Sequence, residues 1–509
     1  MSDQYYLSMH AQQSPGSTAC VLAESGEQTS YATLEATTNQ IAHLFRNLGL
    51  GVGDGIVVMV QNHTRFYQLF WAAHRAGLYF TPISWHSKAD EAKYIIENSG
   101  AKAFVAAARF AEVAQAANQS LPNDLICLSI LGAIEGFDDL EHEMQGCEER
   151  PIADETAGRE LLYTSGTTGR PKGVKFPLSG QPIAETAPDD LSYSAEGYGP
   201  GATVLAPGPL YHASPLMASR AMHRFGGRVL IVDKFDAEAI LRYIETYKVT
   251  HLICVPTHFV RMLNLPDSVR KKYDVSSVKL IMHTGAPCPI ETKHEMIEWF
   301  GPIIVEYYGG TERIGGAIIR SEEWLKRPGS IGRSVAGTAY VVDESDWSVL
   351  PAGETGVLYF DAGETFSYHD DEEKTQKMHS PQGWRTLGDI GRMDEDGYIY
   401  LSDRKSNMII SGGVNIYPQE AENRLVSHPK VADAAVFGIP NEAFGEEVKA
   451  VVQPLPGVEA GAGLEAELIA YCKQTLAGFK CPRSIDFSDE LPRMDNGKLY
   501  KQALKQRYQ

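Results

Sequence analysis

The chain has 509 residues, a length at which two or more domains are expected because a single core stops growing well below this size. Its apolar content of 43% and charged content of 22% are ordinary for a soluble protein. Lys and Arg total 46 against 65 Asp and Glu, and this net charge of −19 argues against non-specific binding to nucleic acid or to an anionic membrane.

Three further features bear on the compartment. Residues 1–16 lack the basic start and apolar run of a secretory signal. No stretch of about 20 apolar residues predicts a membrane-spanning helix. The seven cysteines are scattered and never spaced as C-x-x-C, which favours reduced thiols over disulfides or zinc. We therefore expect a cytoplasmic protein with no membrane span.

Strands and helices are predicted to alternate through the first 150 residues. Apolar spacing predicts helices over 31–48, 65–75 and 91–98, and short apolar runs predict strands over 56–60, 78–83 and 103–106. Strand, helix and strand at this spacing are typical of a parallel sheet. The N-terminal region is therefore expected to be α/β.

A loop rich in Gly, Ser and Thr follows the apolar strand 161–163 and carries Arg170 and Lys172. Glycines let backbone N–H groups crowd around an anion, hydroxyls add donors, and lysine adds a point charge. The spacing is not that of a Walker loop. Two interpretations are open, a phosphate-binding loop and a solvated turn between strands.

Three motifs are predicted to follow strands of the next region. Strands are expected over 228–232, 251–255, 278–282 and 303–307, helices over 237–247 and 257–263, and a surface excursion over 177–201. Ligands of parallel sheets bind beyond the carboxyl ends of the strands. The motifs at such ends are 207–212, 283–287 and 308–312.

The pattern changes in the last third of the chain. Short strands with Gly and Pro turns over 335–360 predict a small β subdomain, closed by 384–389 and 398–401. The charged stretch 403–406 is interpreted as a junction between domains 1–402 and 403–509. The second of these domains is predicted to be α+β, with helices 419–427 and 464–476 and strands 431–437, 447–453 and 484–487.

Ten consecutive positions, Thr164 to Gly173, resemble the signature loop of the adenylate-forming superfamily: acyl-CoA synthetases, luciferases and peptide-synthetase adenylation domains. Four further motifs, at 283–287, 307–312, 386–417 and 492–504, stand in the order of the acyl-CoA synthetase branch. The resemblance covers nearly the whole chain. It implies a large N-terminal α/β domain, with parallel sheets flanked by helices plus a small β subdomain, and a small, mobile α+β C-terminal domain.

The resemblance implies an AMP-forming ligase. Such an enzyme joins a carboxylic acid to the α-phosphate of ATP and then passes the acyl group to the thiol of coenzyme A. By this resemblance Lys498 would bridge the carboxylate and the α-phosphate, Thr311 would touch the α-phosphate, Glu312 would bind Mg²⁺, and His212 would gate the thiol tunnel. The cofactors and partners implied are ATP, Mg²⁺, coenzyme A and a small-molecule carboxylic acid, and a homodimer is left open.

The nucleotide would lie between two walls. Tyr308 would stack on adenine against Gly285, Ala286 and Pro287, and Asp389 and Arg404 would contact the ribose. The full set of ATP- or AMP-binding positions implied by the resemblance is Thr164, Ser165, Gly166, Thr167, Thr168, Gly169, Lys172, Gly285, Ala286, Pro287, Tyr307, Tyr308, Gly309, Thr311, Asp389 and Arg404.

Coenzyme A would thread past Gly412 and Gly413, with Lys480 beside it. The domain hinge would be Ser406, where the family usually carries Asp or Lys. Two other departures are Met494 in place of Thr and Lys501 in place of Arg.

Each of these residues also has a plainer interpretation. Glu312 could be a surface glutamate, Tyr308 a core residue, Arg404 half of an inter-domain salt bridge, Lys498 a lysine on a solvated tail, and His212 a structural histidine.

The acid is less readable. Gly309 stands where acetyl-CoA synthetases have a tryptophan, and Gly310, Gly315 and Gly316 are nearby, which suggests a roomy pocket. We therefore expect a bulky hydrophobic monocarboxylic acid: aryl-alkanoic, steroid side-chain, or medium- to long-chain fatty acid. One alternative is an adenylating enzyme that passes the acyl group to a carrier-protein thiol or to luciferase-like chemistry. A second is a non-catalytic ligand-binding homologue.

Overall fold

The computed structural model describes residues 6–122, 124–164, 171–184, 191–361, 363, 365–493 and 499–508, with backbone alone at 191 and 192. Two compact units are built from separate stretches of chain. The first unit comprises Met1–Cys254, Leu265–Met282 and Glu364–Thr375, and the second comprises Val255–Asn264, His283–Gly363 and Gln376–Gln509.

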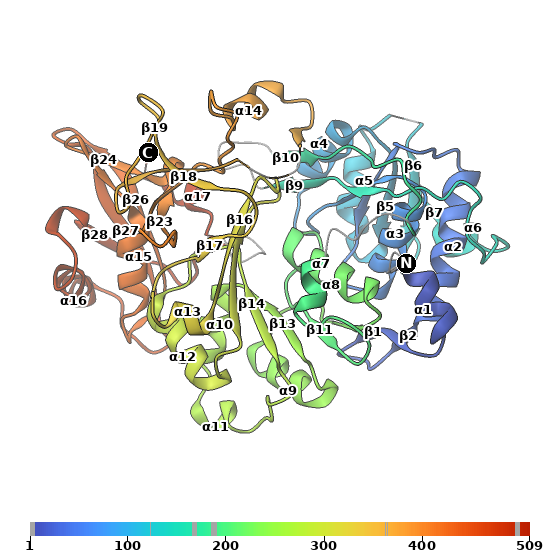
Figure 1. The fold of residues 1–509 in the computed structure, drawn as a ribbon, viewed down its shortest axis with the longest axis horizontal. Coiled ribbons are helices and arrows are strands. Elements are labelled where there is room, and N and C mark those ends of the chain that lie inside the picture. The colour runs from blue at the N-terminus through green and yellow to red at the C-terminus, as the bar shows by residue number, and fades with distance from the viewer. Residues whose placement is uncertain are drawn as a thin grey trace. The chain divides into compact units, whose positions relative to one another are not determined.

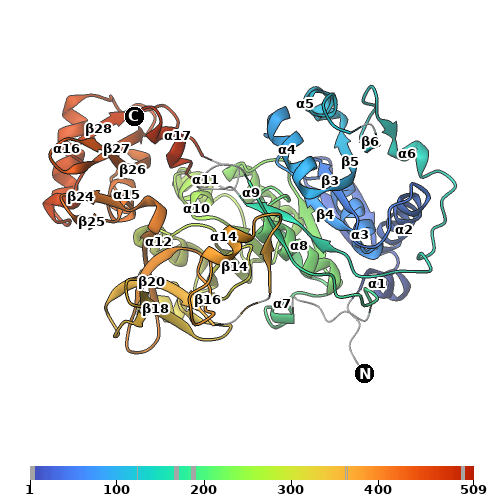
Figure 2. The ribbon, with the colours of Figure 1, turned by 90° about the horizontal axis from the view of Figure 1, so that it is seen from above.

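A parallel six-stranded sheet, in the order β7-β6-β5-β3-β4-β8, lies in the first unit (Figure 1). All five residues of β3 are buried, as expected of a strand covered on both faces. Helices α4 and α5 pack with Val57, Met59 and Phe104 in one core cluster, on the side of the sheet away from α3 (Figure 2). The bounds are β3 Gly55–Met59, β4 Tyr79–Pro82, β5 Ala101–Ala107, β6 Ile126–Ile130, β7 Asp138–Asp139, β8 Arg159–Glu160, α2 Tyr31–Asn47, α3 Thr64–Arg75, α4 Ala89–Ser99, η1 Ala108–Phe110, α5 Ala111–Asn118 and α6 Leu140–Glu143.

Other strands of this unit form the order β13-β11-β12-β1-β2, parallel except for β1 with β2. Helix α8 packs against β11, β12 and β13. A small antiparallel sheet, β21-β10-β9, holds the strands on either side of the predicted phosphate loop. The bounds are α1 Leu7–Gln13, β1 Thr18–Leu22, β2 Gln28–Ser30, β9 Leu162–Thr164, β10 Lys172–Lys175, α7 Leu191–Ala195, β11 Thr203–Leu205, α8 Ala213–Arg224, β12 Arg228–Ile231, α9 Ala237–Tyr247, β13 His251–Cys254, α11 Asp267–Arg270, β14 Leu280–His283 and β21 Ser367–Tyr368.

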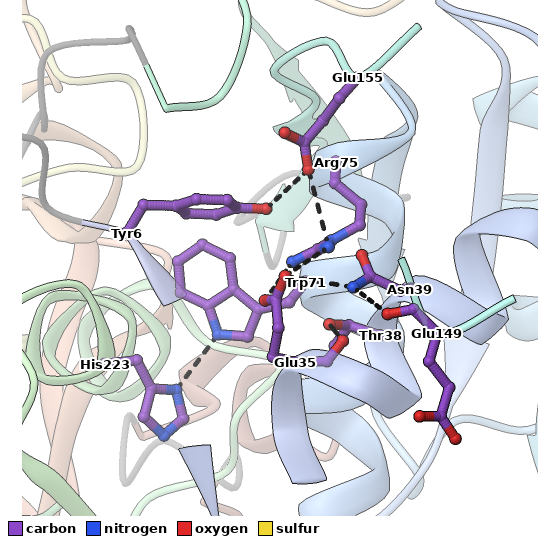
Figure 3. A network of polar contacts seen from close by, with 9 residues as sticks. All are labelled: Tyr6, Glu35, Thr38, Asn39, Trp71, Arg75, Glu149, Glu155 and His223. Atoms are coloured by element: carbon purple, nitrogen blue, oxygen red, sulfur yellow. Dashed lines mark hydrogen bonds and ion pairs between the residues drawn. The ribbon is translucent and has the colours of Figure 1, made fainter. Parts of the chain in front are cut away.

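The core of the first unit contains a buried polar network (Figure 3). The fully buried guanidinium of Arg75, on α3, donates to both carboxylate oxygens of Glu35, on α2, at 3.1 and 2.7 Å. Glu155 lies 3.7 Å from Arg75 and accepts from the Tyr6 hydroxyl at 3.1 Å. Nearby, Trp71 donates to Nδ1 of His223 at 3.2 Å. These contacts tie the N-terminal segment and α8 to α2 and α3.

The second unit begins with antiparallel pairing of β15, β16 and β17. A five-stranded antiparallel sheet, β19-β18-β20-β22-β23, follows. The bounds are α10 Pro256–Leu263, α12 Ile290–Phe300, β15 Ile304–Gly309, β16 Gly316–Arg320, α13 Ser321–Trp324, β17 Arg333–Ser334, β18 Ala339–Asp343, β19 Ser348–Val349, β20 Thr355–Phe360, α14 Glu372–Lys377, β22 Asp389–Met393 and β23 Ile399–Arg404.

A mixed sheet, β25-β24-β27-β26 with β28 beside β27, occupies the C-terminal part. Helices α15 and α16 share one core cluster with Val436 and Val448, whereas Leu504 of α17 packs with Ala435 and Phe437 on the other face (Figure 1). The bounds are η2 Lys405–Asn407, β24 Ile409–Ser411, β25 Val414–Ile416, α15 Pro418–Val426, β26 Val431–Asn441, β27 Gly445–Pro454, α16 Ala462–Lys473, η3 Gly478–Lys480, β28 Ser484–Phe487 and α17 Lys501–Lys505.

The expected fold class is confirmed: a large α/β region with parallel sheets, a small β subdomain and a C-terminal α+β region. Elements that the sequence analysis does not predict include the helices α1, α5, α8 and α12, the strands β1, β6 and β16, and the β24–β25 hairpin. The division at residue 402 remains a prediction. No helix in the part of the chain that the structure describes has both the length and the apolar character needed to cross a membrane.

Candidate functional site

The end of β15 carries the 307–312 motif. Gly309 pairs with Gly316 of β16, and the backbone N–H of Arg313 then donates to the Gly310 carbonyl at 3.1 Å, which closes a tight turn. Arg313 has φ +50°, a left-handed conformation that is uncommon for a residue with a Cβ. The turn places the Glu312 carboxylate against Gly310, where an added Cβ would lie 2.7 Å from Oε2.

Asp389 joins two of the predicted nucleotide residues. The Tyr308 hydroxyl donates to Oδ2 of Asp389 at 2.6 Å, and Nε of Arg404 donates to Oδ1 at 3.2 Å. Burial, together with the Asp389 carboxylate, raises the pKa of Tyr308 well above its usual value, so the phenol stays protonated. A carboxylate offers about four acceptor positions. Among the described residues these two side chains are its donors, which leaves about two acceptor positions for a ligand.

The 283–287 motif forms the loop between β14 and α12. Gly285 has φ +87°, which suits glycine, and Gly285 and Pro287 are exposed whereas His283 is fully buried. This loop and the Tyr308–Asp389–Arg404 cluster belong to the same unit.

Neighbouring side chains fill the space beside the four glycines. An added Cβ would meet Tyr307 at Gly309 and Gly316, Leu387 at Gly310, and Phe360 at Gly315, each closer than about 3.3 Å. The glycines therefore do not by themselves indicate a roomy pocket, and the bulky acid needs other support.

Of the predicted site residues in the first unit, the structure describes Thr164, Lys172 and His212. Thr164 ends β9 and pairs with Lys172 at the start of β10, and the Lys172 ammonium lies 5.1 Å from the ring centre of Tyr368. His212 occupies the N-cap position of α8, with its ring 4.5 Å from that of Tyr211. The loop residues Ser165, Gly166, Thr167, Thr168 and Gly169 are outside the described residues.

Gly412 and Gly413 form the two-residue turn of the β24–β25 hairpin, with φ of +59° and +79°. Two successive positive φ values are typical of a type I′ turn. Lys480 is held by both oxygens of Glu420 at 2.7 and 2.8 Å, and Ser406 lies in the short helix η2. Lys498 is outside the described residues.

Glu312 is the one predicted metal ligand. No group of three or more His, Cys, Asp or Glu side chains suited to a metal occurs among the described residues. A single buried carboxylate fits Mg²⁺, because that ion commonly takes one or two carboxylates and completes its shell with phosphate oxygens and water.

Comparison with known proteins decides the family. A model of the AMP-binding enzyme family matches residues 7–367, and a model of the AMP-binding enzyme C-terminal domain matches residues 420–498. The chain belongs to the AMP-binding enzyme family. Together with the CoA ligases described next, these matches confirm the acyl-CoA synthetase branch of the adenylate-forming superfamily and the expectation of an enzyme, an acid–thiol ligase.

Several relatives of this family member are similar over nearly their whole length. The long-chain-fatty-acid–CoA ligase FadD13 of Mycobacterium tuberculosis is 29% identical over 99% of this chain and 98% of its own. Feruloyl-CoA synthase of Amycolatopsis sp is 29% identical over 98% and 97%. Crotonobetaine/carnitine–CoA ligase of Salmonella typhimurium is 30% identical over 94% and 93%.

Solved structures share the fold of this AMP-binding enzyme. ATP-bound MatB from Rhodopseudomonas palustris is 27% identical with a TM-score of 0.82, covering 99% of both chains. The o-succinylbenzoate CoA synthetase MenE from Bacillus subtilis, in complex with its acyl-adenylate intermediate, is 26% identical with a TM-score of 0.80, covering 99% of this chain and 98% of its own.

Proposed function

We propose that this AMP-binding enzyme is an AMP-forming carboxylic acid:CoA ligase that uses the residues predicted above. The observation that carries the proposal is the Asp389 carboxylate. It accepts from Tyr308 and Arg404 and keeps two acceptor positions, the number needed for the two hydroxyls of a ribose.

Adenylation would begin with the nucleotide held by its base and sugar. The hydroxyl of Tyr308 is fixed by its bond to Asp389, which supports a role for its ring in stacking on adenine, with the exposed Gly285–Pro287 loop as the other wall. Thr311 would donate to the α-phosphate, and Lys172 and residues 164–169 would hold the other phosphates. Glu312 would hold Mg²⁺, which when bound offsets the charge of the phosphates.

Lys498 would act only when charge grows between the carboxylate and the α-phosphate. Its ammonium would neutralise the oxygens of both reactants, which are anions that otherwise repel. In the second step the thiol of coenzyme A would pass the Gly412–Gly413 turn and displace AMP, with His212 at the acyl side and Lys480 near the coenzyme. Ser406 would serve as the hinge between domains 1–402 and 403–509.

We infer that the acid is a bulky hydrophobic monocarboxylate. Two of the similar proteins are named for a long-chain fatty acid and for ferulate, which supports a large acyl group. A cytoplasmic location remains part of the same proposal, and the oligomeric state is left open.

Pyrophosphate release from Mg-ATP tests the function. The acids would be acetate, octanoate, palmitate, a phenylpropanoate and a steroid side-chain acid, each with and without coenzyme A. We expect turnover that needs both a bulky acid and coenzyme A. Activity confined to acetate would refute the bulky acid, pyrophosphate without thioester would move the acyl group to another acceptor, and no release with any acid would favour a binding protein.

Substitution of Lys498 separates the two half-reactions. Lys498→Ala should lower adenylation by orders of magnitude because a charge that acts only in the transition state is removed. The same variant should convert a supplied acyl-adenylate and coenzyme A to thioester at close to the wild-type rate. Equal loss of both steps would contradict the role given to Lys498.

A further inference from the structure

A second charged cluster of this unit is buried beneath the 283–287 loop. Lys293, in the first turn of α12, has no exposed side-chain surface, and its ammonium lies 2.6 Å from Oε2 of Glu306 on β15. Nε2 of His283, the last residue of β14, lies 3.7 Å from the same oxygen. The Lys293 ammonium lies 4.8 Å from the ring centre of Trp324. The ring centres of Phe259 and His283 are 5.2 Å apart in an edge-on contact.

One carboxylate oxygen therefore lies near both ends of the loop, accepting from the Lys293 ammonium and lying 3.7 Å from Nε2 of His283, which is beyond hydrogen-bond distance. His283 immediately precedes the loop, and Lys293 is tied to its last residue because the Lys293 backbone N–H donates to the Pro289 carbonyl at 3.0 Å. Glu306 itself stands two residues before Tyr308. Glu306 therefore connects the segments that carry the two walls proposed for adenine, the Gly285–Pro287 loop and Tyr308.

Stability alone is a weak reason for such a pair. Desolvating two charges opposes their attraction, and well-packed apolar residues often replace a buried ion pair without loss. Burial raises the pKa of Glu306, partly offset by Lys293, and lowers the pKa of His283, which marks how unfavourable charge is at this depth. An apolar contact has little directional preference. The charged hydrogen bond of 2.6 Å between Lys293 and Glu306, in contrast, fixes the position of α12 relative to β15.

We propose that Glu306 is a positioning residue of the nucleotide site, whose carboxylate, hydrogen-bonded to Lys293 and adjacent to His283, sets the spacing between the Gly285–Pro287 loop and Tyr308. The inference rests on the proposed function, because the adenine role of these two walls belongs to it. It predicts that the cluster determines nucleotide affinity and base selectivity beyond any effect on folding.

The decisive variant is the neutral pair Lys293→Met/Glu306→Gln. Each single change leaves a buried charge without its partner and should lower the melting temperature, whereas the double change removes both charges. The control is Lys449→Met/Asp486→Asn, which removes the 2.7 Å ion pair between another buried lysine and a half-exposed aspartate on β27 and β28 of the same unit.

AMP affinity by calorimetry and ATP-over-GTP preference in pyrophosphate release are the readouts, each beside a melting curve. We expect the neutral pair to melt within a few degrees of the wild type, to bind AMP about tenfold more weakly and to discriminate less against GTP, while the control binds AMP normally. Hydrogen exchange of peptides over 284–289 should accelerate in the neutral pair alone.

Normal AMP affinity and normal exchange in a folded neutral pair would overturn the inference and leave the proposed function intact. If the neutral pair does not fold, Lys293→Arg replaces it, because that change keeps the charge but alters the geometry of the bond; normal AMP affinity in a stable Lys293→Arg variant would again refute the positioning role. A wild-type chain that binds no AMP would overturn the proposed function and, with it, the role of the loop.

Discussion

Replacing Arg75 by methionine should strongly destabilise the first unit. The change keeps an unbranched apolar stem but leaves the carboxylate of Glu35, 12% exposed, without the two hydrogen bonds that it accepts from Arg75, so that only the one from Asn39 at 3.2 Å remains. Breaking a buried ion pair by removing one partner costs about 3–5 kcal/mol. An exposed pair contributes about 0.2–1 kcal/mol, so Arg109→Met, which removes the Asp233 pair with side chains 57% and 41% exposed, is the matched control.

Hydrogen exchange of peptides from α2 and α3 measures the loss of stability at these two helices. A local measurement is preferable here, because a chain of two units need not unfold in a single cooperative transition. Because about 1.4 kcal/mol is a factor of ten, amides that open with the unit should exchange roughly 10²- to 10⁴-fold faster in Arg75→Met and less than about tenfold faster in Arg109→Met. Adding Glu35→Leu to Arg75→Met should recover much of the loss.

Similar exchange in Arg75→Met and Arg109→Met would refute the reasoning, because it would mean that water reaches Glu35 as readily as it reaches an exposed carboxylate. Failure of Glu35→Leu to recover protection would show that packing of the arginine stem, rather than the charge, holds α2 to α3.

Three further predictions follow from single residues. Burial lowers the pKa of His223 to about 3, so the unfolded chain binds a proton that the folded chain does not between about pH 6.5 and 3. The free energy of unfolding should therefore fall on acidification. His223→Gln should reduce the dependence of this free energy on pH by up to about 1.4 kcal/mol per pH unit, as measured by urea unfolding at pH 7.0 and 5.5. An unchanged pH dependence would mean that another group is responsible. Gly413→Ala should cost roughly 1–2 kcal/mol, because its φ is +79° and no atom lies within 4 Å of the added Cβ. Gly413→Ala should slow thioester formation more than adenylation. The control Gly397→Ala, at φ +82°, should not slow thioester formation selectively. Equal effects of Gly413→Ala on both steps would contradict the role of the turn. Asp389→Asn should weaken AMP binding at least tenfold by calorimetry, because hydrogen bonds to a charged group contribute about 1.5–3 kcal/mol each, and unchanged affinity would remove Asp389 from the site.

Sequence predicted those elements whose local pattern agrees with their packing. Helix α9 has the bounds that the sequence predicts, 237–247. In the structure Asp236 caps this helix, accepting from the backbone of Ala239 at 2.8 Å, and apolar residues follow at helical spacing. The strand 484–487 was placed at its observed bounds as well. The motifs also correctly indicated which strand ends carry polar loops, as β14 and β15 show.

Helices α8 and α12, which bury charged side chains, are not predicted from the sequence. Helix α12 places Lys293 inward and α8 buries Arg220 and His223, whereas periodicity assigns such residues to the solvent side. Only pairing with a distant partner, Glu306 for Lys293 and Glu160 for Arg220, makes these positions interior. No local pattern reports a partner that lies on another element, and the same limit hid the Arg75–Glu35 pair.

The interleaving of the two units along the chain constrains how the protein is made. Strand β10, which follows the predicted phosphate loop, pairs with β21, and β21 belongs to a stretch that returns to the first unit only at residue 364. At about 5–20 residues per second, a ribosome that has finished residue 254 needs roughly 6–24 s to reach residue 375. Throughout that interval the loop's sheet lacks an edge strand, so a nascent chain stalled or cleaved before β21 would expose β10 to chaperones and to wrong partners.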